Sequence, residues 1–377
     1  MYCDEIIVVE PGADSVVSHQ LEKLELFLEG FNSLGIKCNI FCNKNPKKDF
    51  GRNSVSCNKL WVNRLRGILP GKIYVWFLEF LCYYRAFVSA NKKQMMVLGL
   101  TVSAPYGVLI AYLLSRPKYG VTIRVLNFGL ISSSAGSYQV NKKCINSWKI
   151  LISNGVNIVK LTSTGNSLLC TNVTNKVGSI NTIPEIVSCP NIGVRIKSAP
   201  LSLLVVGCDD GHRRNALMAL VRGGYLRGLK ELHIHAPGHS YARLADGSKY
   251  LPPLGVKVKF TNNYITGEEL TTMVRSSSAC LIGYQQGFCN PSSVLYLSVM
   301  AGVPVLSSNF PDGIYSFDTC GKLGEMFKME TEGDLSRAWG RFLEWGDLEY
   351  GKFSEAREKL RAMVNPLTVA RRHLEVY

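Results

Sequence analysis

The sequence predicts an α/β protein that is built from two doubly wound parallel sheets. Short apolar runs without charges, such as Ile6–Val9 and Leu203–Gly207, alternate with longer stretches of helical character, and this alternation is typical of repeated β–α–β units. The chain has 377 residues, of which 46% are hydrophobic. Because one domain usually has about 100–200 residues, the chain is long enough for two cored domains of similar size.

The first domain opens with a β–loop–α–β unit. Strand Ile6–Val9 leads through a loop into a helix over residues 18–33, and strand Gly35–Phe41 follows. A right-handed crossover of this kind starts a parallel sheet. Further strands, each with a helix after it, are expected at residues 95–102, 121–126 and 158–161.

Two segments of the first domain fit more than one structure. Residues 95–115 carry no charge. This uncharged segment is as long as a membrane-spanning helix, which needs about 20 residues. Gly99, Pro105 and Gly107 interrupt this segment, so we favour a strand, a turn and a helix. Residues 68–90 mix aromatic and basic side chains. This composition fits either a helix at a membrane surface or a core helix, and both alternatives stay open.

The segment from Asn290 to Ser308 is predicted to form a loop, an apolar helix, a tight turn and a strand. Asn290–Ser292 supplies a helix N-cap and a proline near the first turn. Gly302 ends the helix, and a short core strand follows. A helix that begins at the carboxyl edge of a parallel sheet offers unpaired N–H groups and a positive dipole end, which favour a bound phosphate. An ordinary αβ unit of a doubly wound sheet has the same spacing.

Ser298–Ser308 resembles the donor-site segment of the retaining GT-B glycosyltransferases, the "group 1" family. In that family, a helix that ends in small residues runs into Gly-x-Pro-Val and a strand, as it does at Gly302–Val305. Other segments resemble the strands and the acidic helix start that precede the donor loop, in the order that the family shows. These segments are Leu203–Gly207, Val256–Phe260 with Thr266–Leu270, and Ser278–Gly283.

The resemblance implies a GT-B fold, in which two Rossmann-like domains face each other across a cleft. It implies an acceptor-side domain over residues 1–190, a linker over residues 191–200 and a nucleotide-sugar domain over residues 201–360. The final helix, within residues 361–377, is expected to cross back to the first domain. The implied activity is metal-independent, retaining transfer of a sugar from a nucleotide-diphosphate sugar to a glycan or a lipid-linked glycan.

The chain differs from the family at positions that contact the donor. Two glutamates, which bind the ribose and support the sugar in the family, align with Cys289 and Leu297. Neither side chain accepts a hydrogen bond as a carboxylate does. The family's catalytic-side histidine aligns near Asn127. These replacements favour an alternative, a catalytically silent GT-B protein that binds a glycan or a partner enzyme.

Polar loops after predicted strands supply the candidate site residues. His19, at a helix start, is either a base or polar contact, or an ordinary surface histidine. Arg213 and Arg214, in the loop after Gly207, are suited to holding a diphosphate by bidentate hydrogen bonds. The predicted donor-binding residues are Gly12, Ser15, Gly207, Arg213, Arg214, Asn290, Ser292, Ser293, Asp312 and Glu325, and the predicted catalytic-side residues are His19 and Asn127.

The charge balance favours association with polyanions. The chain has 43 Lys and Arg against 28 Asp and Glu, for a net charge of +15. The expected partners are a nucleotide sugar, a glycan or lipid-linked acceptor, and the surface of an anionic membrane. A nucleic-acid-modifying transferase is the second alternative. The sequence contains no nucleic-acid recognition module, so nucleic acid is not an expected partner.

Cysteines and histidines show no metal or disulfide signature. The 12 cysteines are spaced singly, without a Cys-x-x-Cys pair, as is typical of a reducing compartment. His233 and His235 share one face of a predicted strand, and we favour a core pair over a metal site. The acidic start Met1–Glu5 is unlike a secretory signal. We therefore expect no metal or cofactor, and a cytoplasmic protein with peripheral contact at a membrane's cytoplasmic face.

Overall fold

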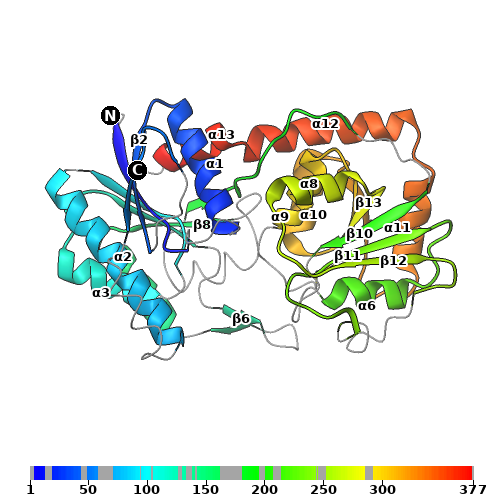
Figure 1. The fold of residues 1–377 in the computed structure, drawn as a ribbon, viewed down its shortest axis with the longest axis horizontal. Coiled ribbons are helices and arrows are strands. Elements are labelled where there is room, and N and C mark those ends of the chain that lie inside the picture. The colour runs from blue at the N-terminus through cyan, green and yellow to red at the C-terminus, as the bar shows by residue number, and fades with distance from the viewer. Residues whose placement is uncertain are drawn as a thin grey trace. The chain divides into compact units, whose positions relative to one another are not determined.

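The chain divides into two compact units (Figure 1). The C-terminal unit is formed by Val187–Val364, and the N-terminal unit by the described residues before Val187 together with those from Asn365 onward. The computed structural model describes residues 4–12, 19–43, 49–57, 71–93, 95–102, 105–125, 130–132, 138–140, 142–161, 181–194, 200–206, 214–242, 244, 252–284 and 292–375.

A seven-stranded parallel sheet forms the centre of the N-terminal unit, in the order β3-β2-β1-β4-β5-β8-β9. Its strands are β1 (Glu5–Val9), β2 (Lys37–Cys42), β3 (Ser54–Cys57), β4 (Met96–Gly99), β5 (Val121–Val125), β8 (Asn157–Leu161) and β9 (Asn181–Ile183). A separate antiparallel pair joins β6 (Leu130–Ser132) to β7 (Tyr138–Val140). The strand order reverses between β1 and β4, which makes this point the topological switch of the sheet.

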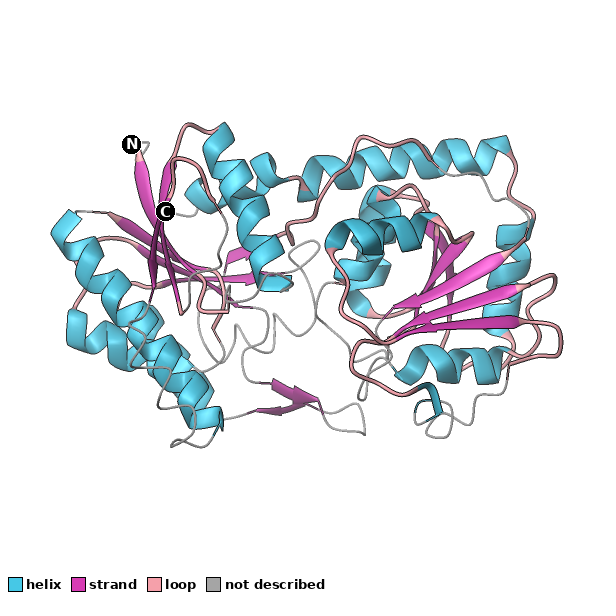
Figure 2. Ribbon diagram, in the orientation of Figure 1, coloured by secondary structure: helices cyan, strands magenta, loops and turns pink. Residues whose placement is uncertain are grey.

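Helices cover both faces of this sheet (Figure 2). One face packs against α1 (His19–Ser33) and α13 (Pro366–Glu375), through core residues that include Leu24, Phe27 and Val369. The other face packs against α2 (Gly71–Lys93), α3 (Pro105–Ser115) and α4 (Lys142–Ser153), with Phe87 and Trp148 in that core. Helix α13 follows the whole C-terminal unit in sequence, so the chain returns to the N-terminal unit at its end.

The two ambiguous segments are resolved by the packing of this second core. The uncharged segment 95–115 forms strand β4 and helix α3, as favoured from its glycines and proline. Helix α2 buries Cys82, Tyr83 and Phe87 in the core. It is therefore a core helix that packs one face on the sheet and leaves the other face outside. Over the described residues, no helix is long and apolar enough to span a membrane.

The C-terminal unit has a six-stranded parallel sheet, in the order β12-β11-β10-β13-β14-β15. The strands are β10 (Ser202–Val206), β11 (Glu231–His235), β12 (Lys257–Thr261), β13 (Ala279–Ile282), β14 (Val305–Ser308) and β15 (Gly324–Phe327). The helices are α6 (Arg214–Gly223), α8 (Gly267–Arg275), α9 (Ser293–Met300), α10 (Pro311–Cys320), α11 (Asp334–Leu343) and α12 (Asp347–Val364).

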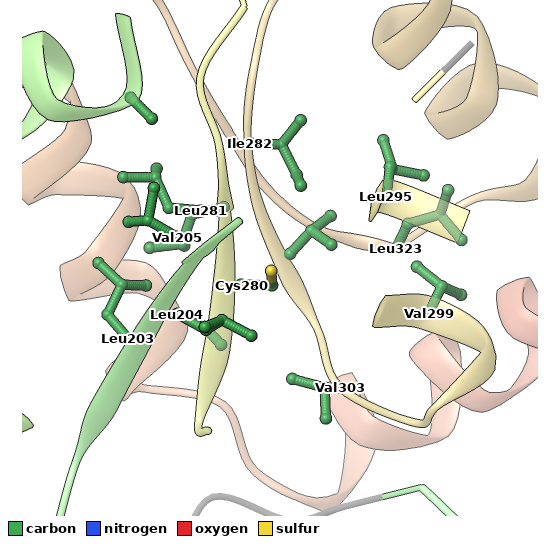
Figure 3. Close-up of a cluster of buried hydrophobic side chains, with 14 of the residues drawn as sticks. Leu203, Leu204, Val205, Cys280, Leu281, Ile282, Leu295, Val299, Val303 and Leu323 are labelled. Atoms are coloured by element: carbon green, nitrogen blue, oxygen red, sulfur yellow. The ribbon is translucent and has the colours of Figure 1, made fainter. Parts of the chain in front are cut away.

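The apolar strands of this sheet form a core with helices on both sides. Figure 3 shows Leu203, Val205 and Leu281 on one side of the neighbouring strands β10 and β13, and Leu295 and Val299 of helix α9 on the other. Because these strands are buried on both faces, they consist of continuous apolar runs. This continuity is what made β10, β13 and β14 predictable from the sequence.

Three arginines hold the segment that enters the C-terminal unit. Arg357 of α12 is buried and donates from Nη2 to the carbonyl oxygens of Ile192 (2.6 Å) and Met300 (2.8 Å). Arg275 of α8 donates to the carbonyl oxygens of Gly193 (3.3 Å) and Ala301 (2.9 Å). Both arginines therefore tie the entering segment to the C-terminal end of α9.

Arg361 adds a bond to the carbonyl oxygen of Pro190 at 3.2 Å. Gly302 follows α9 in the left-handed conformation, with φ of 79°. A Cβ atom added there would lie 2.5 Å from the carbonyl oxygen of Gly193. The predicted helix stop at Gly302 thus also makes room for the entering chain.

Candidate functional site

The C-terminal unit has its topological switch between β10 and β13. In open parallel sheets, ligands bind at such a switch, next to the carboxyl ends of the strands. Gly283 directly follows β13 at this edge. A Cβ atom added at Gly283 would lie 2.5 Å from Cα and 2.8 Å from the backbone nitrogen of Ala216. Since Ala216 lies in the first turn of α6, only glycine lets the start of this helix lie directly against the strand end.

Tyr284 and two serines connect the elements around this edge. Ser308, the last residue of β14, accepts a hydrogen bond from the backbone nitrogen of Tyr284 (2.9 Å) and donates one to its carbonyl oxygen (2.8 Å). Ser292 caps helix α9 by accepting from the nitrogen of Leu295 (3.2 Å), and donates to the hydroxyl of Tyr284 (3.3 Å). The ends of β13 and β14 and the start of α9 therefore form one hydrogen-bonded platform.

Helix α10 is attached to the same platform. The hydroxyl of Tyr296, in α9, donates to Oδ2 of Asp312 at 2.9 Å. The ring of Phe310, just before α10, meets the ring of Tyr284 edge to face, with centroids 5.0 Å apart. Asp312 is buried, so its carboxylate holds α9 and α10 together.

Helices α6 and α9 both begin at this edge, and neither has an acidic residue in its first turn. The first N–H groups of a helix have no partner within the helix, and the helix dipole adds positive potential there. Ser293, the first residue of α9, is partly exposed, whereas its neighbour Ser292 is buried. The arrangement is suited to binding an anion such as a diphosphate.

A second polar cluster marks the switch point of the N-terminal unit. Glu10 follows β1 and is buried. Its Oε1 accepts from the backbone nitrogen of Gly12 (3.0 Å), and its Oε2 accepts from the hydroxyl of Thr101 (2.6 Å), which lies just beyond β4. Burial raises the pKa of Glu10 to about 7, although these hydrogen bonds and the charges of Arg124 and Lys23 lower it. The carboxyl group thus bridges the two strands at which the sheet reverses.

Further charged side chains lie beneath helix α1, on the face of the sheet that α1 and α13 cover. Arg124 of β5 stacks on the ring of Phe27, with its guanidinium carbon 4.2 Å from the ring centroid. Its Nη2 lies 3.7 Å from Oε1 of Glu185, which also pairs with Lys23 at 2.9 Å. Burial lowers the pKa of Arg124 to about 10 and that of the nearby His373 to about 3. Glu185 thus joins Lys23 of α1 to Arg124 of the sheet, whereas His373 of α13 is uncharged.

The structure describes only part of the predicted site. Gly12, Ser292, Ser293 and Asp312 lie at the two carboxyl edges, as described above. His19 is the first residue of α1, and Arg214 is the first residue of α6. Ser15, Asn127, Gly207, Arg213, Cys289 and Asn290 lie outside the described residues. For all of these residues, the roles in donor binding or catalysis stay predictions.

Glu325 and Leu297 are engaged within the protein. Glu325, in β15, accepts from Trp345 Nε1 (2.8 Å) and Arg341 Nε (2.9 Å), and pairs with Lys322 (2.9 Å). These partners use both carboxylate oxygens, so we leave Glu325 out of the proposed donor site. Leu297 packs its side chain against the hydrophobic core of the unit.

The histidine pair of β11 lies within the sheet. Nε2 of His233 lies 2.9 Å from the hydroxyl of Thr261 on the neighbouring strand, and His235 is buried. Within the part of the chain that the structure describes, no group of three or more His, Cys, Asp or Glu side chains is arranged to hold a metal ion.

Sequence reasoning missed Glu10, Thr101, Tyr284 and Ser308. A usable signal existed for Glu10, since it is the first polar residue after the first buried strand. Tyr284 lies two residues beyond the end of β13, and Ser308 is the last residue of β14. Their pairing across 24 residues depends on strand order, which the local pattern does not contain.

The two parallel sheets, with their reversal points and helical layers, define the fold of the GT-B glycosyltransferases, as the sequence predicted. A glycosyltransferase from Rickettsia africae matches with a TM-score of 0.65 at 12% identity, over 99% of this chain and 97% of that one. A UDP-forming trehalose-phosphate synthase from Burkholderia xenovorans matches with 0.64 at 11%, over 100% and 98%.

Anabaena HepE, in complex with UDP and glucose, matches with a TM-score of 0.63 at 10% identity, over 99% of both chains. By sequence, no protein-family model and no curated protein matches this chain. At identities this low, the likeness establishes the fold, and the function has to be argued from the site.

Proposed function

We propose that the protein is a glycosyltransferase that moves a sugar from a nucleoside-diphosphate sugar to a glycan or a lipid-linked glycan. The observation that carries this proposal is the switch point of the C-terminal unit, where α6 and α9 begin beside Gly283 without acidic residues in their first turns. The likeness to HepE, whose structure holds UDP and glucose, supports a donor of the same chemical class.

The proposed chemistry follows from the charges at this edge. As the sugar leaves, negative charge develops on the diphosphate, and fixed positive groups stabilise it. The N-terminal dipoles of α6 and α9 would provide such groups, together with Arg214, the first residue of α6, and Arg213, which precedes it in the sequence. We propose that these groups suffice without a metal ion. Retention of the anomeric configuration is proposed from the resemblance of Ser298–Ser308 to the retaining family.

Calorimetric titration with UDP, GDP, CDP and dTDP tests the donor site. We expect one of these diphosphates to bind and Ser293→Asp to weaken its binding at least about tenfold, because the new carboxylate lies where the phosphates would bind. The same substitution places an acid in the first turn of α9, which favours the helix. The melting temperature should therefore stay the same or rise, which separates lost binding from lost folding.

Leu348→Asp is the matched control, because it adds one negative charge to the exposed second residue of α12 in the same unit. It should leave diphosphate binding unchanged. Equal binding by wild type and Ser293→Asp, or equal losses in both variants, would contradict the proposed site. Turnover is then measured as release of the diphosphate from the matching nucleotide sugar, and NMR of the new glycosidic bond reports retention or inversion.

A catalytically silent protein of the same fold is the second candidate. The packing of Leu297 into the core favours it, because an apolar side chain stands where the family has a ribose-binding glutamate. Diphosphate binding without turnover of any nucleotide sugar would support this candidate over the transferase.

We propose further that the protein acts in the cytoplasm, at the surface of an anionic membrane that carries its acceptor. The net charge of +15 supports this location, since each Lys or Arg near an anionic surface contributes about 1 kcal/mol of attraction.

A further inference from the structure

Helix α3 exposes an apolar stripe on the outside of the N-terminal unit. Ile110, Leu113 and Leu114 are 50%, 48% and 65% exposed, and their spacing puts them on one side of the helix. Ile150 of the neighbouring helix α4 is 42% exposed. We call these four residues the α3 patch.

Helix α3 lies between α2 and α4, as contacts on both sides show. Asn91 of α2 donates to the carbonyl oxygen of Ser115 at 2.9 Å, so the C-terminal ends of α2 and α3 lie side by side (Figure 1). On the other side, the hydroxyl of Tyr112 donates to the carbonyl oxygen of Asn154, one turn beyond Ile150. The α3 patch therefore lies in the middle of a three-helix layer.

Exposed basic side chains lie near the C-terminal ends of α2, α3 and α4, the helices that carry the α3 patch. The exposed cations at this end of the layer are Lys92, Lys93, Arg116, Lys118 and Lys149. The turn that carries Arg116 and Lys118 is held against α2, since Asn91 accepts from the backbone nitrogen of Lys118 at 2.8 Å. Across residues 71–93, 105–120 and 142–155, the only acid in the sequence is Glu79, and it is buried.

The opposite face of the same sheet has a different charge pattern. Helix α1 carries Glu22, Glu25 and Glu29 on partly or fully exposed positions. Because α13 on that face also carries the exposed Arg371 and Arg372, the charges there are mixed, whereas the exposed charges on the three-helix layer are positive. General solubility does not require the combination of aliphatic side chains and positive charges on this layer, because exposed apolar residues on soluble surfaces are usually scattered singly.

We propose that the α3 patch, with the nearby cations, docks the protein on an anionic lipid bilayer. Aliphatic side chains that enter the headgroup region and cations that meet acidic lipids are the two components of interfacial binding. A second copy of this chain is a poorer occupant, since a two-fold interface would bring Arg116 and Lys118 of both copies together. The inference deepens the membrane contact proposed above and does not depend on catalysis.

Co-sedimentation of the purified full chain with lipid vesicles tests the proposal. We expect binding to mixed vesicles of phosphatidylcholine and phosphatidylglycerol, and at most weak binding to phosphatidylcholine alone. The double variant Leu113→Ser/Leu114→Ser should bind at least about tenfold more weakly, because two exposed leucines no longer enter the interface. In the double variant Arg116→Glu/Lys118→Glu, the affinity for mixed vesicles at low salt should fall at least about fivefold for each cation replaced.

Matched controls in the C-terminal unit make the same changes in composition. Arg227→Glu/Lys230→Glu removes the same charge from exposed positions, and Leu254→Ser/Leu348→Ser removes two exposed leucines. Both controls should bind vesicles as the wild type does, and melting curves check that all variants fold.

Three results would overturn the proposal. They are no binding to the mixed vesicles, equal loss in the patch and control variants, and sedimentation of the wild type as a dimer that Leu113→Ser/Leu114→Ser converts to a monomer. None of these results bears on diphosphate binding, so this proposal and the proposed function can fail separately.

Discussion

Glu10 is expected to make the stability of the N-terminal unit fall as the pH rises from about 5 to about 8. Burial raises the pKa of this carboxyl from 4.5 to about 7 in the folded protein. Because the folded pKa lies above the unfolded one, the protonated group contributes stability that is present below about pH 4.5 and is lost as the pH rises through about 7.

The size of the effect follows from the difference between the two pKa values. A shift from 4.5 to about 7 corresponds to about 3 kcal/mol at roughly 1.4 kcal/mol per pH unit. About 2.5 kcal/mol of this falls between about pH 5 and pH 8, because the unfolded glutamate is already mostly ionised at the lower value. The physical cause is the cost of ionising a carboxyl group that water does not reach.

Urea unfolding of wild type and Glu10→Gln across this pH range measures the effect. Glutamine does not titrate and keeps an oxygen that accepts from Gly12, so its stability relative to the wild type should rise by about 2.5 kcal/mol from pH 5 to pH 8. Glu29→Gln, at an exposed position on α1, controls for the loss of one carboxylate. The reasoning is refuted if the stability difference between wild type and Glu10→Gln is the same at both pH values.

Three stability predictions concern the C-terminal unit, each measured as the free energy of unfolding in urea. Arg357→Met removes the buried donor to the carbonyl groups of Ile192 and Met300 and should cost about 2–4 kcal/mol, whereas Arg361→Met should cost less than about 1 kcal/mol. Equal costs would contradict the role of Arg357. Gly302→Ala should cost at least about 2 kcal/mol, through backbone strain and through the contact with the entering chain. Gly224 has a φ of 69° and open space around it, so Gly224→Ala should cost about 1 kcal/mol. A larger cost at Gly224 than at Gly302 would exclude the contact as the cause. Tyr296→Phe removes one donor from a buried carboxylate and should cost about 1–3 kcal/mol, and an unchanged stability would show that the bond contributes nothing.

Local pattern was sufficient for the elements that repeat one simple signal. The strands at Ile6–Val9, Leu203–Val206 and Ala279–Ile282 are apolar runs of strand length, and each is a strand in the structure. The acidic helix start expected at Thr266–Leu270 is present, and the structure adds a capping box in which Thr266 and Glu269 bond reciprocally. Such features depend on neighbours in sequence, so a single sequence contains them.

The missed strands have mixed patterns. Strand β15 contains Glu325, whose charge is matched by Lys322 and by Arg341 of helix α11. Strand β3 has four residues, two of which are serines. Partners from distant segments let these polar residues enter the sheet, and no local rule anticipates those partners.

By itself, the sequence determined the fold class, the positions of the central strands, the helix start at Ser292 and the chain reversal at Gly302. Each of these follows from apolar periodicity or from the backbone preferences of a few residue types. Only the tertiary structure decided that Glu10 meets Thr101, that Tyr284 meets Ser308, and that the cations near the α3 patch gather on one face. These depend on strand order and helix packing, which bring together residues that are far apart in the chain.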